Sequence, residues 1–320
     1  MTSNSTAVDA GDTLNIGPGP VFMCSGQGSQ KPGMGADLLD VPEVAQTFAC
    51  ASEVFGRDIA DLCANASAEE LNDTRNAQAA IATLSVGIAN ALKARGVNPC
   101  AVLGFSLGQI SALAISDMVS EEDAFGIVKV RSQLMGQAAD AHPGVMSAFL
   151  KADAASVEAV CAEEAKGQVL VPANYNCPGQ IVVAGEPEAV ARAEEAWAAR
   201  GKRYSRLATS GAFHSPLMAS ACEPFRAYLE TVEFSEACIP LVCNTDAAPL
   251  TAADAVDHLV AHLTHPVRFE QSVQALEAAG ADAFIEVGFG GVLSGLVRRI
   301  DKSLARSCVQ DAASLAACVE

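Results

Sequence analysis

The strongest constraint on the fold is a serine flanked by glycines, Gly104-Phe105-Ser106-Leu107-Gly108, between a buried strand and a helix. Residues 101–104 form a short apolar run typical of a strand buried on both faces, and helical spacing follows over residues 107–115. A G-x-S-x-G motif in this context holds the serine hydroxyl above the sheet, and the next main-chain N–H lies at the helix start. The motif predicts an α/β body with a parallel-rich sheet and makes Ser106 a candidate nucleophile. An ordinary serine in a tight-packing turn is the alternative.

Composition excludes several classes of protein. Of the 320 residues, 50% are hydrophobic and 18% charged, which excludes a mostly disordered chain and a coiled-coil or collagen-like rod. The formal net charge of -18 works against binding to nucleic acid or to an anionic membrane surface. The uncharged stretches 76–92 and 100–116 are shorter than the roughly 20 residues of a membrane span and contain polar side chains. We therefore expect neither nucleic acid nor membrane as a partner.

The cysteines and the first residues predict a cytoplasmic location. Eleven cysteines are scattered along the chain without a Cys-x-x-Cys pair, which favours reduced thiols over a disulfide framework. Residues 1–20 are polar and have no basic residue ahead of an apolar run, so they lack the layout of a secretory signal. We interpret them as a flexible leader.

The middle of the chain changes pattern after His142-Pro143-Gly144. Segments typical of strands and helices then alternate as β-α-β-β-α-β, over residues 145–150, 156–165, 169–174, 180–184, 187–200 and 203–207. This order predicts a ferredoxin-like subdomain over residues 143–207. It is inserted into a large α/β-hydrolase-like body of residues 21–142 and 208–306, which has further strands expected at 238–243 and 283–287 and a last helix at 291–300. Residues 307–320 are expected to form a C-terminal tail.

A serine nucleophile needs a base, and His214 is the best candidate. It lies in a loop of small residues, 210–216, directly after the predicted subdomain, although a loop histidine is often merely exposed. His258, His262 and His265 have a spacing that places imidazoles on one helix face, as metal ligands or as ordinary helix-end histidines. No carboxylate or cysteine is placed to complete a ligand set with them and Pro266 ends the helix, so we expect no metal. The glycine-rich residues 288–291 lack a nucleotide-loop register and favour a helix-entry turn.

Six segments in one colinear order resemble the malonyl-CoA:acyl carrier protein transacylases and the related acyltransferase domains of polyketide synthases. The segments are 26–30 (GQGSQ), 104–108 (GFSLG), 131–135 (RSQLM), 174–180 (NYNCPGQ), 212–218 (AFHSPLM), and 286–288 (EVG) with 293–296 (LSGL). The resemblance covers about residues 21–300. It implies ping-pong transfer of a malonyl group from malonyl-CoA to the phosphopantetheine thiol of an acyl carrier protein. It implies no cofactor.

The resemblance also implies roles for individual residues. Ser106 carries the acyl group and His214 is the base, while the main-chain N–H groups of Gln27 and Leu107 form the oxyanion hole. Arg131, on a helix whose start is marked by a capping Ser120, binds the free malonyl carboxylate. An arginine in an acyl cleft is expensive to desolvate unless the acyl group carries a negative end, which favours malonyl over acetyl.

Further residues are expected to support the site. The histidine base in this family is oriented by a main-chain carbonyl, and the matching stretch begins at His262, where family members usually carry glutamine. Phe213 is expected to crowd a methylmalonyl branch, and Asn176 belongs to a matched segment. Two departures from the family pattern, Phe105 and Gln109, are expected to affect pocket polarity and helix capping without removing a reacting group.

Two other functions share some of these features. A serine esterase of α/β-hydrolase type has the same motif, but it needs an acid after a strand between Ser106 and His214, and none is evident. A non-catalytic module that docks carrier proteins is the second alternative. In either transfer or docking, an acidic carrier protein needs a basic rim, and the candidates near the cleft are Lys202, Arg203, Arg206, Arg298 and Arg299. A monomer is the family default. A standalone chain favours a fatty-acid over a polyketide carrier.

Overall fold

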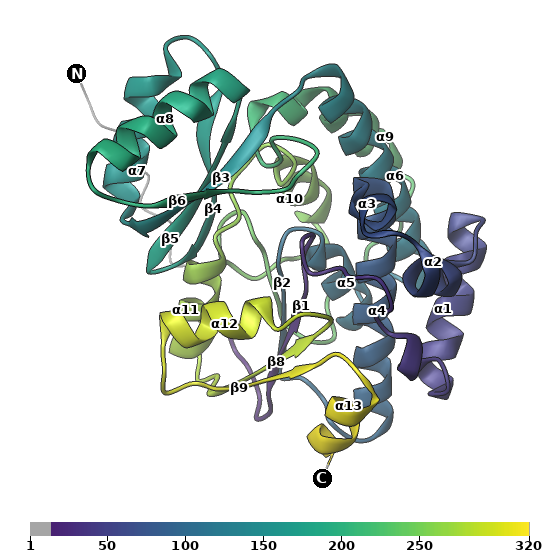
Figure 1. Cartoon of the computed structure of the whole chain (residues 1–320). Helices are drawn as coiled ribbons and strands as arrows, with labels where there is room; N and C mark the ends of the chain where they lie inside the picture. The colour runs from purple at the N-terminus through teal and green to yellow at the C-terminus, as the bar shows by residue number, and fades with distance from the viewer. Residues whose placement is uncertain (1–13, 320) are drawn as a thin grey trace.

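The computed structural model describes residues 14–319 and contains two β-sheets (Figure 1). The larger sheet has five parallel strands in the order β7-β2-β1-β8-β9. Its strands are β1 (Val21–Cys24), β2 (Ala101–Gly104), β7 (Leu241–Val242), β8 (Ala283–Val287) and β9 (Ala305–Val309). The predicted α/β class with a parallel sheet is confirmed.

Helices cover both faces of this sheet, because alternate side chains of its strands are apolar on both sides (Figure 1). Phe22 and Cys24 of β1 face the larger helical layer, while Val21 and Met23 face α11 (Phe269–Ala278) and α12 (Val292–Ile300). The helices of the larger layer are α1 (Pro42–Phe55), α2 (Ile59–Asn65), α3 (Ala68–Asn72), α4 (Thr74–Ala94), α5 (Gly108–Ile115), α6 (Glu121–Ala141), α9 (Cys222–Leu229), α10 (Ala255–Ala261) and α13 (Ala312–Val319). Short 3-10 helical turns lie at Ala36–Leu38 and Pro216–Ala221.

The second sheet is antiparallel and lies at the upper left of Figure 1. Its strands stand in the order β4-β5-β3-β6. They are β3 (Val145–Ala152), β4 (Leu170–Cys177), β5 (Gly179–Gly185) and β6 (Tyr204–Arg206), with the helices α7 (Ala154–Ala165) and α8 (Pro187–Ala199). These elements have their own apolar core, in which the rings of Phe149 and Trp197 stack with centroids 4.9 Å apart.

Strand β4 joins this unit to the loop before α11. Asn174 forms a parallel bridge with Val267, and the Tyr175 N–H donates to the Val267 carbonyl at 2.8 Å. The bridge brings the second half of β4 beside residues 262–267, so that both sheets contribute to one cleft.

The expectation of a tail at 307–320 was wrong for the residues described. Residues 305–309 form β9, which pairs with β8, and α13 follows and buries Leu315. The sequence signal is weak because three of the five strand residues, Ala305, Arg306 and Ser307, are exposed on an edge strand. The strand expected over 238–243 is reduced to Leu241–Val242, since Pro240 has no N–H to give to a ladder.

Other expectations from composition concern the leader, membranes and thiols. Most of the expected leader, residues 1–13, lies outside the described residues, whereas Leu14 and Ile16 pack against the core beside α11. Within residues 14–319 no helix combines the length and the apolar character that a membrane crossing requires. All eleven cysteines lie in this part of the chain and are unpaired.

Candidate active site

Ser106 occupies the turn between β2 and α5 with a φ of 54°. This left-handed conformation is strained for a residue other than glycine, and close packing holds it. A Cβ atom on Gly104 would lie 2.1 Å from the main-chain nitrogen of Gln109, and one on Gly108 would lie 2.1 Å from the Cys24 carbonyl oxygen. Both glycines are therefore required for α5 to approach β1 and β2 this closely.

Asn244, which the sequence analysis missed, braces this turn from the end of β7. Its Oδ1 accepts the Ser106 N–H at 2.8 Å, and its Nδ2 donates to the Gly104 carbonyl at 2.7 Å. Its own N–H donates to Oε1 of Gln109 at 2.8 Å. Gln109 was expected to act in helix capping, but its side chain is fully buried and positions Asn244. The available signal was a polar residue directly after a buried strand.

His214 meets Ser106 from the loop before the second 3-10 turn. Its Nε2 lies 2.7 Å from Ser106 Oγ, and its Nδ1 lies 2.8 Å from the main-chain carbonyl of His262. A carbonyl can only accept, so Nδ1 carries the proton and Nε2 is free to accept from the serine hydroxyl. His214 is 2% exposed and also has a positive φ, 58°. The geometry is that of a serine with a neutral imidazole base oriented by a carbonyl.

Burial, together with the nearby charge of Arg131, lowers the pKa of His214 to about 3. Burial also lowers the pKa of His262 well below its ordinary value, helped by the neighbouring His214. The two rings lie side by side with centroids 4.8 Å apart. Both imidazoles are therefore neutral at physiological pH, which is the state that a general base requires.

This shift predicts an unusual pH dependence. We expect the second-order rate of Ser106 acylation to stay level from about pH 8 to about pH 5, without the decline near pH 6.5 of an unperturbed histidine. The free energy of unfolding, in contrast, should depend on pH. Below about pH 6.5 His214 binds a proton in the unfolded chain but not in the folded protein, so the free energy of unfolding falls as the pH drops toward the folded pKa. Stopped-flow acylation and urea unfolding across this range test both statements. A midpoint near pH 6.5 in the rate would contradict the assignment of a neutral buried base.

Arg131 approaches the same hydroxyl from α6. Its Nη2 lies 3.5 Å from Ser106 Oγ and its Nη1 donates to Gln78 Oε1 at 2.8 Å. The side chain is 2% exposed, and burial lowers its pKa to about 10, so it stays charged at neutral pH. No carboxylate within residues 14–319 forms an ion pair with it. A buried cation without an anionic partner beside a nucleophile is suited to bind an anionic substrate group.

Gln78 belongs to a hydrogen-bond chain that sequence reasoning did not find. Gln78 Nε2 donates to Thr74 Oγ1 at 3.0 Å, and the Thr74 hydroxyl donates to Gln27 Oε1 at 2.9 Å. The chain connects Arg131 to the turn that carries Gln27. Thr74 and Gln78 both lie on α4, and the apolar residues around them in the sequence predicted only a core helix.

The turn of residues 26–28 lies against the serine turn. A Cβ atom on Gly26 would be 2.6 Å from the Phe105 carbonyl oxygen, so glycine permits the contact. Within the described chain, the main-chain N–H groups of Gln27 and Leu107 have no hydrogen-bond acceptor. Both N–H groups at this junction therefore lack an acceptor within residues 14–319, and Gln27 also lines the adjoining cavity.

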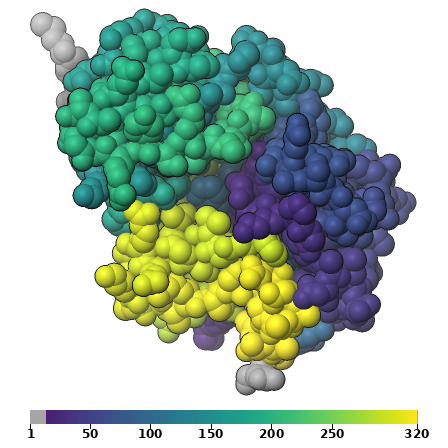
Figure 2. Space-filling view, viewed as in Figure 1, coloured from purple at the N-terminus to yellow at the C-terminus, as the bar shows by residue number. Residues whose placement is uncertain are grey.

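A cavity of about 510 Å³ lies beside the serine turn. The first sheet's unit contributes Ser106, Arg131 and His214, and the second contributes Asn174 and Asn176 among others. In the view of Figure 2, the green surface of the second unit meets the purple surface of the early residues and the yellow surface of the late ones. The cavity therefore lies where the two sheets' units meet, with its rim built from segments distant in sequence.

Other predicted residues lie around this cavity. Asn176 is 8% exposed, donates weakly to Gln180 Oε1 at 3.4 Å, and has an unpartnered Oδ1. Phe213 lines the cavity, as does Phe105, whose ring packs edge-on against Phe269 with centroids 5.5 Å apart. Phe105, one of the two departures from the family pattern, therefore adds an apolar side chain to the cavity wall. Residues 288–291 form the turn into α12, with Gly291 at a φ of 67°.

The three histidines of the helical pattern have separate partners. The main-chain carbonyl of His262 accepts the hydrogen bond from His214, and within the described residues the buried Nε2 of His262 has no partner. His265 is exposed and its Nδ1 lies 2.9 Å from the Ala261 carbonyl, while His258 faces Cys243 and Asp246. The structure therefore does not arrange these three as a ligand set.

The predicted basic rim is partly engaged within the protein. Lys202 contacts Asp153 at 3.4 Å and lies over the Trp197 ring, and Arg206 pairs with Glu194. Arg203, Arg298 and Arg299 are exposed and form no ion pair among the described residues. These three retain charge available to a partner.

Comparison with known proteins identifies similar chains. Residues 21–317 match the acyl transferase domain family. The chain is 39% identical over 303 residues to the malonyl CoA-acyl carrier protein transacylase of Escherichia coli K12, covering 93% of this chain and 98% of that one. It is 38% identical over 294 residues to the Bacillus subtilis protein of the same name, covering 91% and 93%.

Solved structures agree with these similarities. An acyl carrier protein S-malonyltransferase from Vibrio cholerae is similar with a TM-score of 0.89 and 38% identity, covering 94% of this chain and 99% of that one. A malonyl-transacylase solved in complex with its type II polyketide synthase acyl-carrier protein is similar with a TM-score of 0.91 and 37% identity, with the same coverage of 94% and 99%.

Proposed function

The chain belongs to the malonyl CoA-acyl carrier protein transacylase family of acyl transferases, and we propose that it moves a malonyl group from malonyl-CoA to the thiol of an acyl carrier protein. One observation carries the proposal. Ser106 Oγ lies 2.7 Å from His214 Nε2 and 3.5 Å from Arg131 Nη2, so one hydroxyl meets both a neutral base and a buried cation.

In the first half-reaction, Ser106 Oγ attacks the thioester carbonyl of malonyl-CoA while Nε2 of His214 takes the hydroxyl proton. The carbonyl oxygen becomes an oxyanion, which the N–H groups of Gln27 and Leu107 stabilise by hydrogen bonds. The C–S bond then breaks, and the imidazolium returns its proton to the coenzyme A thiolate. Malonyl-Ser106 remains.

In the second half-reaction, the pantetheine thiol of the carrier protein enters the same cavity. His214 accepts the thiol proton, the sulfur attacks the serine ester, and Ser106 recovers its proton as it leaves. The same base and the same oxyanion donors serve both halves because the two tetrahedral intermediates differ only in their sulfur substituent.

Arg131 determines which class of acyl group is transferred. A guanidinium that is 2% exposed and has no carboxylate partner in residues 14–319 gains a bidentate ion pair when the malonyl carboxylate binds. An acetyl group leaves that charge unpaired. Phe213 lines the same cavity next to the base, and we propose that it crowds a 2-methyl branch.

The orientation of His214 distinguishes the transferase from the esterase alternative. Its Nδ1 bonds a main-chain carbonyl, whereas an α/β-hydrolase triad places a carboxylate there. A base that is oriented by a main-chain carbonyl instead of a carboxylate agrees with the family pattern described above.

The proposal is tested by following the acyl group. Purified protein is incubated with malonyl-CoA, and its intact mass is expected to rise by one malonyl group. Addition of carrier protein bearing phosphopantetheine is expected to return the mass to its starting value as the carrier gains malonyl. A protein that stays unmodified, or an adduct that carrier protein does not remove, contradicts the proposed transfer.

Docking of the acidic carrier protein is expected to use Arg203, Arg298 and Arg299. The double variant Arg298→Glu/Arg299→Glu should raise the KM for carrier protein by about tenfold at low salt and leave acylation by malonyl-CoA unchanged, since rim charges act mainly on association. Lys166→Glu, an exposed charge at the end of α7 that does not line the cavity, is the matched control. Equal carrier kinetics in the double variant and the control would exclude this patch.

We also propose a specific fold for each of the two units. We assign residues 143–207 to a ferredoxin-like unit inserted in an α/β-hydrolase-like body of residues 21–142 and 208–306, to which β9 and α13 add. The strand order β4-β5-β3-β6 supports this assignment. A cytoplasmic location and a carrier of fatty-acid synthesis accord with free thiols and with the family.

A further inference from the structure

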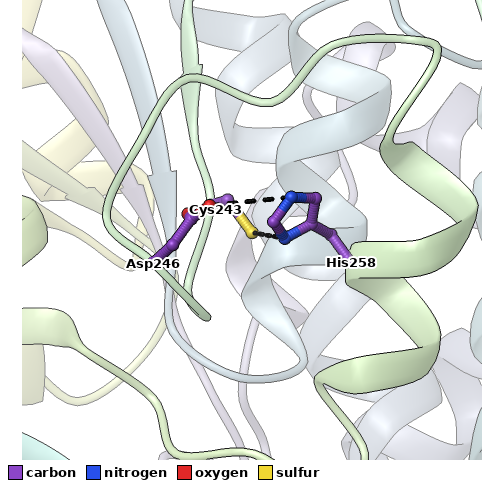
Figure 3. Close-up of side chains that lie close together, drawn as sticks. All are labelled: Cys243, Asp246 and His258. Atoms are coloured by element: carbon purple, nitrogen blue, oxygen red, sulfur yellow. Dashed lines mark hydrogen bonds and ion pairs between the residues drawn. The ribbon is translucent and has the colours of Figure 1, made fainter. Parts of the chain in front are cut away.

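A second cluster of reactive side chains consists of Cys243 and Asp246 from the loop after β7 and His258 from α10 (Figure 3). Cys243 Sγ is 3.4 Å from His258 Nδ1, and Asp246 Oδ2 is 3.6 Å from His258 Nε2. One potential ligand atom of each residue lies within 4.8 Å of those of the other two. The proposed transfer uses none of these side chains, so the cluster is unexplained by it.

We propose that Cys243, Asp246 and His258 bind one Zn²⁺ ion, with water as the fourth ligand. Thiolate, imidazole and carboxylate are the donors that zinc takes in proteins, and its bond lengths place neighbouring ligand atoms of a tetrahedron about 3.4–3.6 Å apart. The separation of Cys243 Sγ and His258 Nδ1 already has this value. The cluster therefore has the donor types of a zinc site and the spacing of one.

The third ligand has to move to complete the site. Only one imidazole nitrogen can serve, and Nδ1 is the one that faces the thiol, so the Asp246 carboxylate must swing from Nε2 toward Nδ1. Its side chain is 43% exposed and can do so. The Thr245 hydroxyl, 2.7 Å from Nδ1 and 3.1 Å from Sγ, gives up these hydrogen bonds when the metal enters.

Access and charge are compatible with binding. Cys243 is fully buried, but the His258 side chain is 28% exposed, so an ion reaches the thiol from the solvent side past His258 and Asp246. The Cys243 thiol releases its proton to solvent on binding. The resulting thiolate and the Asp246 carboxylate neutralise the two positive charges of the ion.

The site is connected to the serine turn. Cys243 directly precedes Asn244, and Gln109 bonds both, through Nε2 to Cys243 Sγ at 3.7 Å and through Oε1 to the Asn244 N–H. Asn244 in turn holds the Ser106 N–H. A metal here stabilises the loop that braces the nucleophile, and it remains separate from the acyl cavity.

Titration of the full chain with Co²⁺, which substitutes for zinc and is visible, tests the inference. We expect a thiolate-to-cobalt charge-transfer band that saturates at one equivalent and disappears on addition of Zn²⁺. Zn²⁺ should also raise the unfolding temperature. Cys243→Ser is expected to lose the band, and Asp246→Asn should weaken Co²⁺ binding by at least about tenfold.

Matched variants exclude binding by other thiols and histidines. Cys238→Ser removes an exposed cysteine and His265→Gln an exposed histidine of the same region, and both should retain the band. Asp246→Asn changes an exposed side chain and keeps the test valid if Cys243→Ser unfolds. Absence of a one-equivalent band in the wild type, or the same band in Cys243→Ser, would overturn the zinc site. Because no acyl substrate is involved, this outcome is independent of the proposed transfer.

Discussion

Replacing Ser106 with alanine is expected to abolish the malonyl adduct and to lower transfer to carrier protein by about 10⁴-fold or more. The hydroxyl is the group that His214 contacts at 2.7 Å, and no other nucleophile of the described residues is bonded to that imidazole. The fold should survive, because the side chain removed is small and lies at the cavity rather than in the core. Intact-mass analysis after incubation with malonyl-CoA measures the adduct directly.

Ser111→Ala is the control for this variant. Ser111 lies on α5, one turn beyond the serine turn, and its hydroxyl is buried without a hydrogen-bond partner. Its removal leaves no group unsatisfied, so both acylation and stability should remain close to wild type. An adduct that persists in Ser106→Ala would assign the acyl group to another residue and remove the proposed mechanism.

The reacting residues were predictable because each carries a local signal. Ser106 stands between glycines at a strand-to-helix transition, and His214 lies in a loop of small residues. Arg131 needed the resemblance to a family, since spacing alone fits an exposed helix arginine. That it is buried and without an acid partner among the described residues emerged only from the packing of α6 against α4.

The residues that hold the site were not predictable in the same way. Asn244 acts because β7 lies beside β2 in the sheet, 138 residues from Ser106 in the chain, and no local pattern reports strand order. Gln78 is a polar residue inside a long apolar helix, where sequence favours a core reading. His258 was grouped with His262 and His265 by helical spacing, but its partners come from the loop after β7.

The second unit and the last strand show the same contrast for the fold. The order of elements in residues 143–207 followed from alternating local periodicity, because β3, β4, β5 and both helices bury apolar residues in a core of their own, whereas only the short β6 is exposed. Strand β9 has mainly exposed residues and is fixed by pairing with β8, so its pattern alone resembled a tail.

Arg131→Ala is expected to lower kcat/KM for malonyl-CoA by about 10³-fold, since two charge-assisted hydrogen bonds to the carboxylate are lost. The rate with acetyl-CoA should stay level or rise, because the variant no longer leaves a guanidinium unpaired beside a neutral acyl group. Both changes lower the preference for malonyl over acetyl. Competition between malonyl-CoA and acetyl-CoA for Ser106, read by intact mass, measures their ratio.

Two further variants separate charge from shape. Arg131→Met fills most of the same volume without charge, so it should have the same selectivity as the alanine variant. It also controls for loss of stability caused by the cavity that alanine would leave beside α6. Arg131→Lys keeps the charge but loses the planar fork that spans Gln78 and the carboxylate, and it should recover only part of the preference for malonyl. Unchanged malonyl selectivity in the methionine variant would show that another group binds the carboxylate. Full recovery by lysine would show that charge alone, rather than bidentate geometry, selects the substrate.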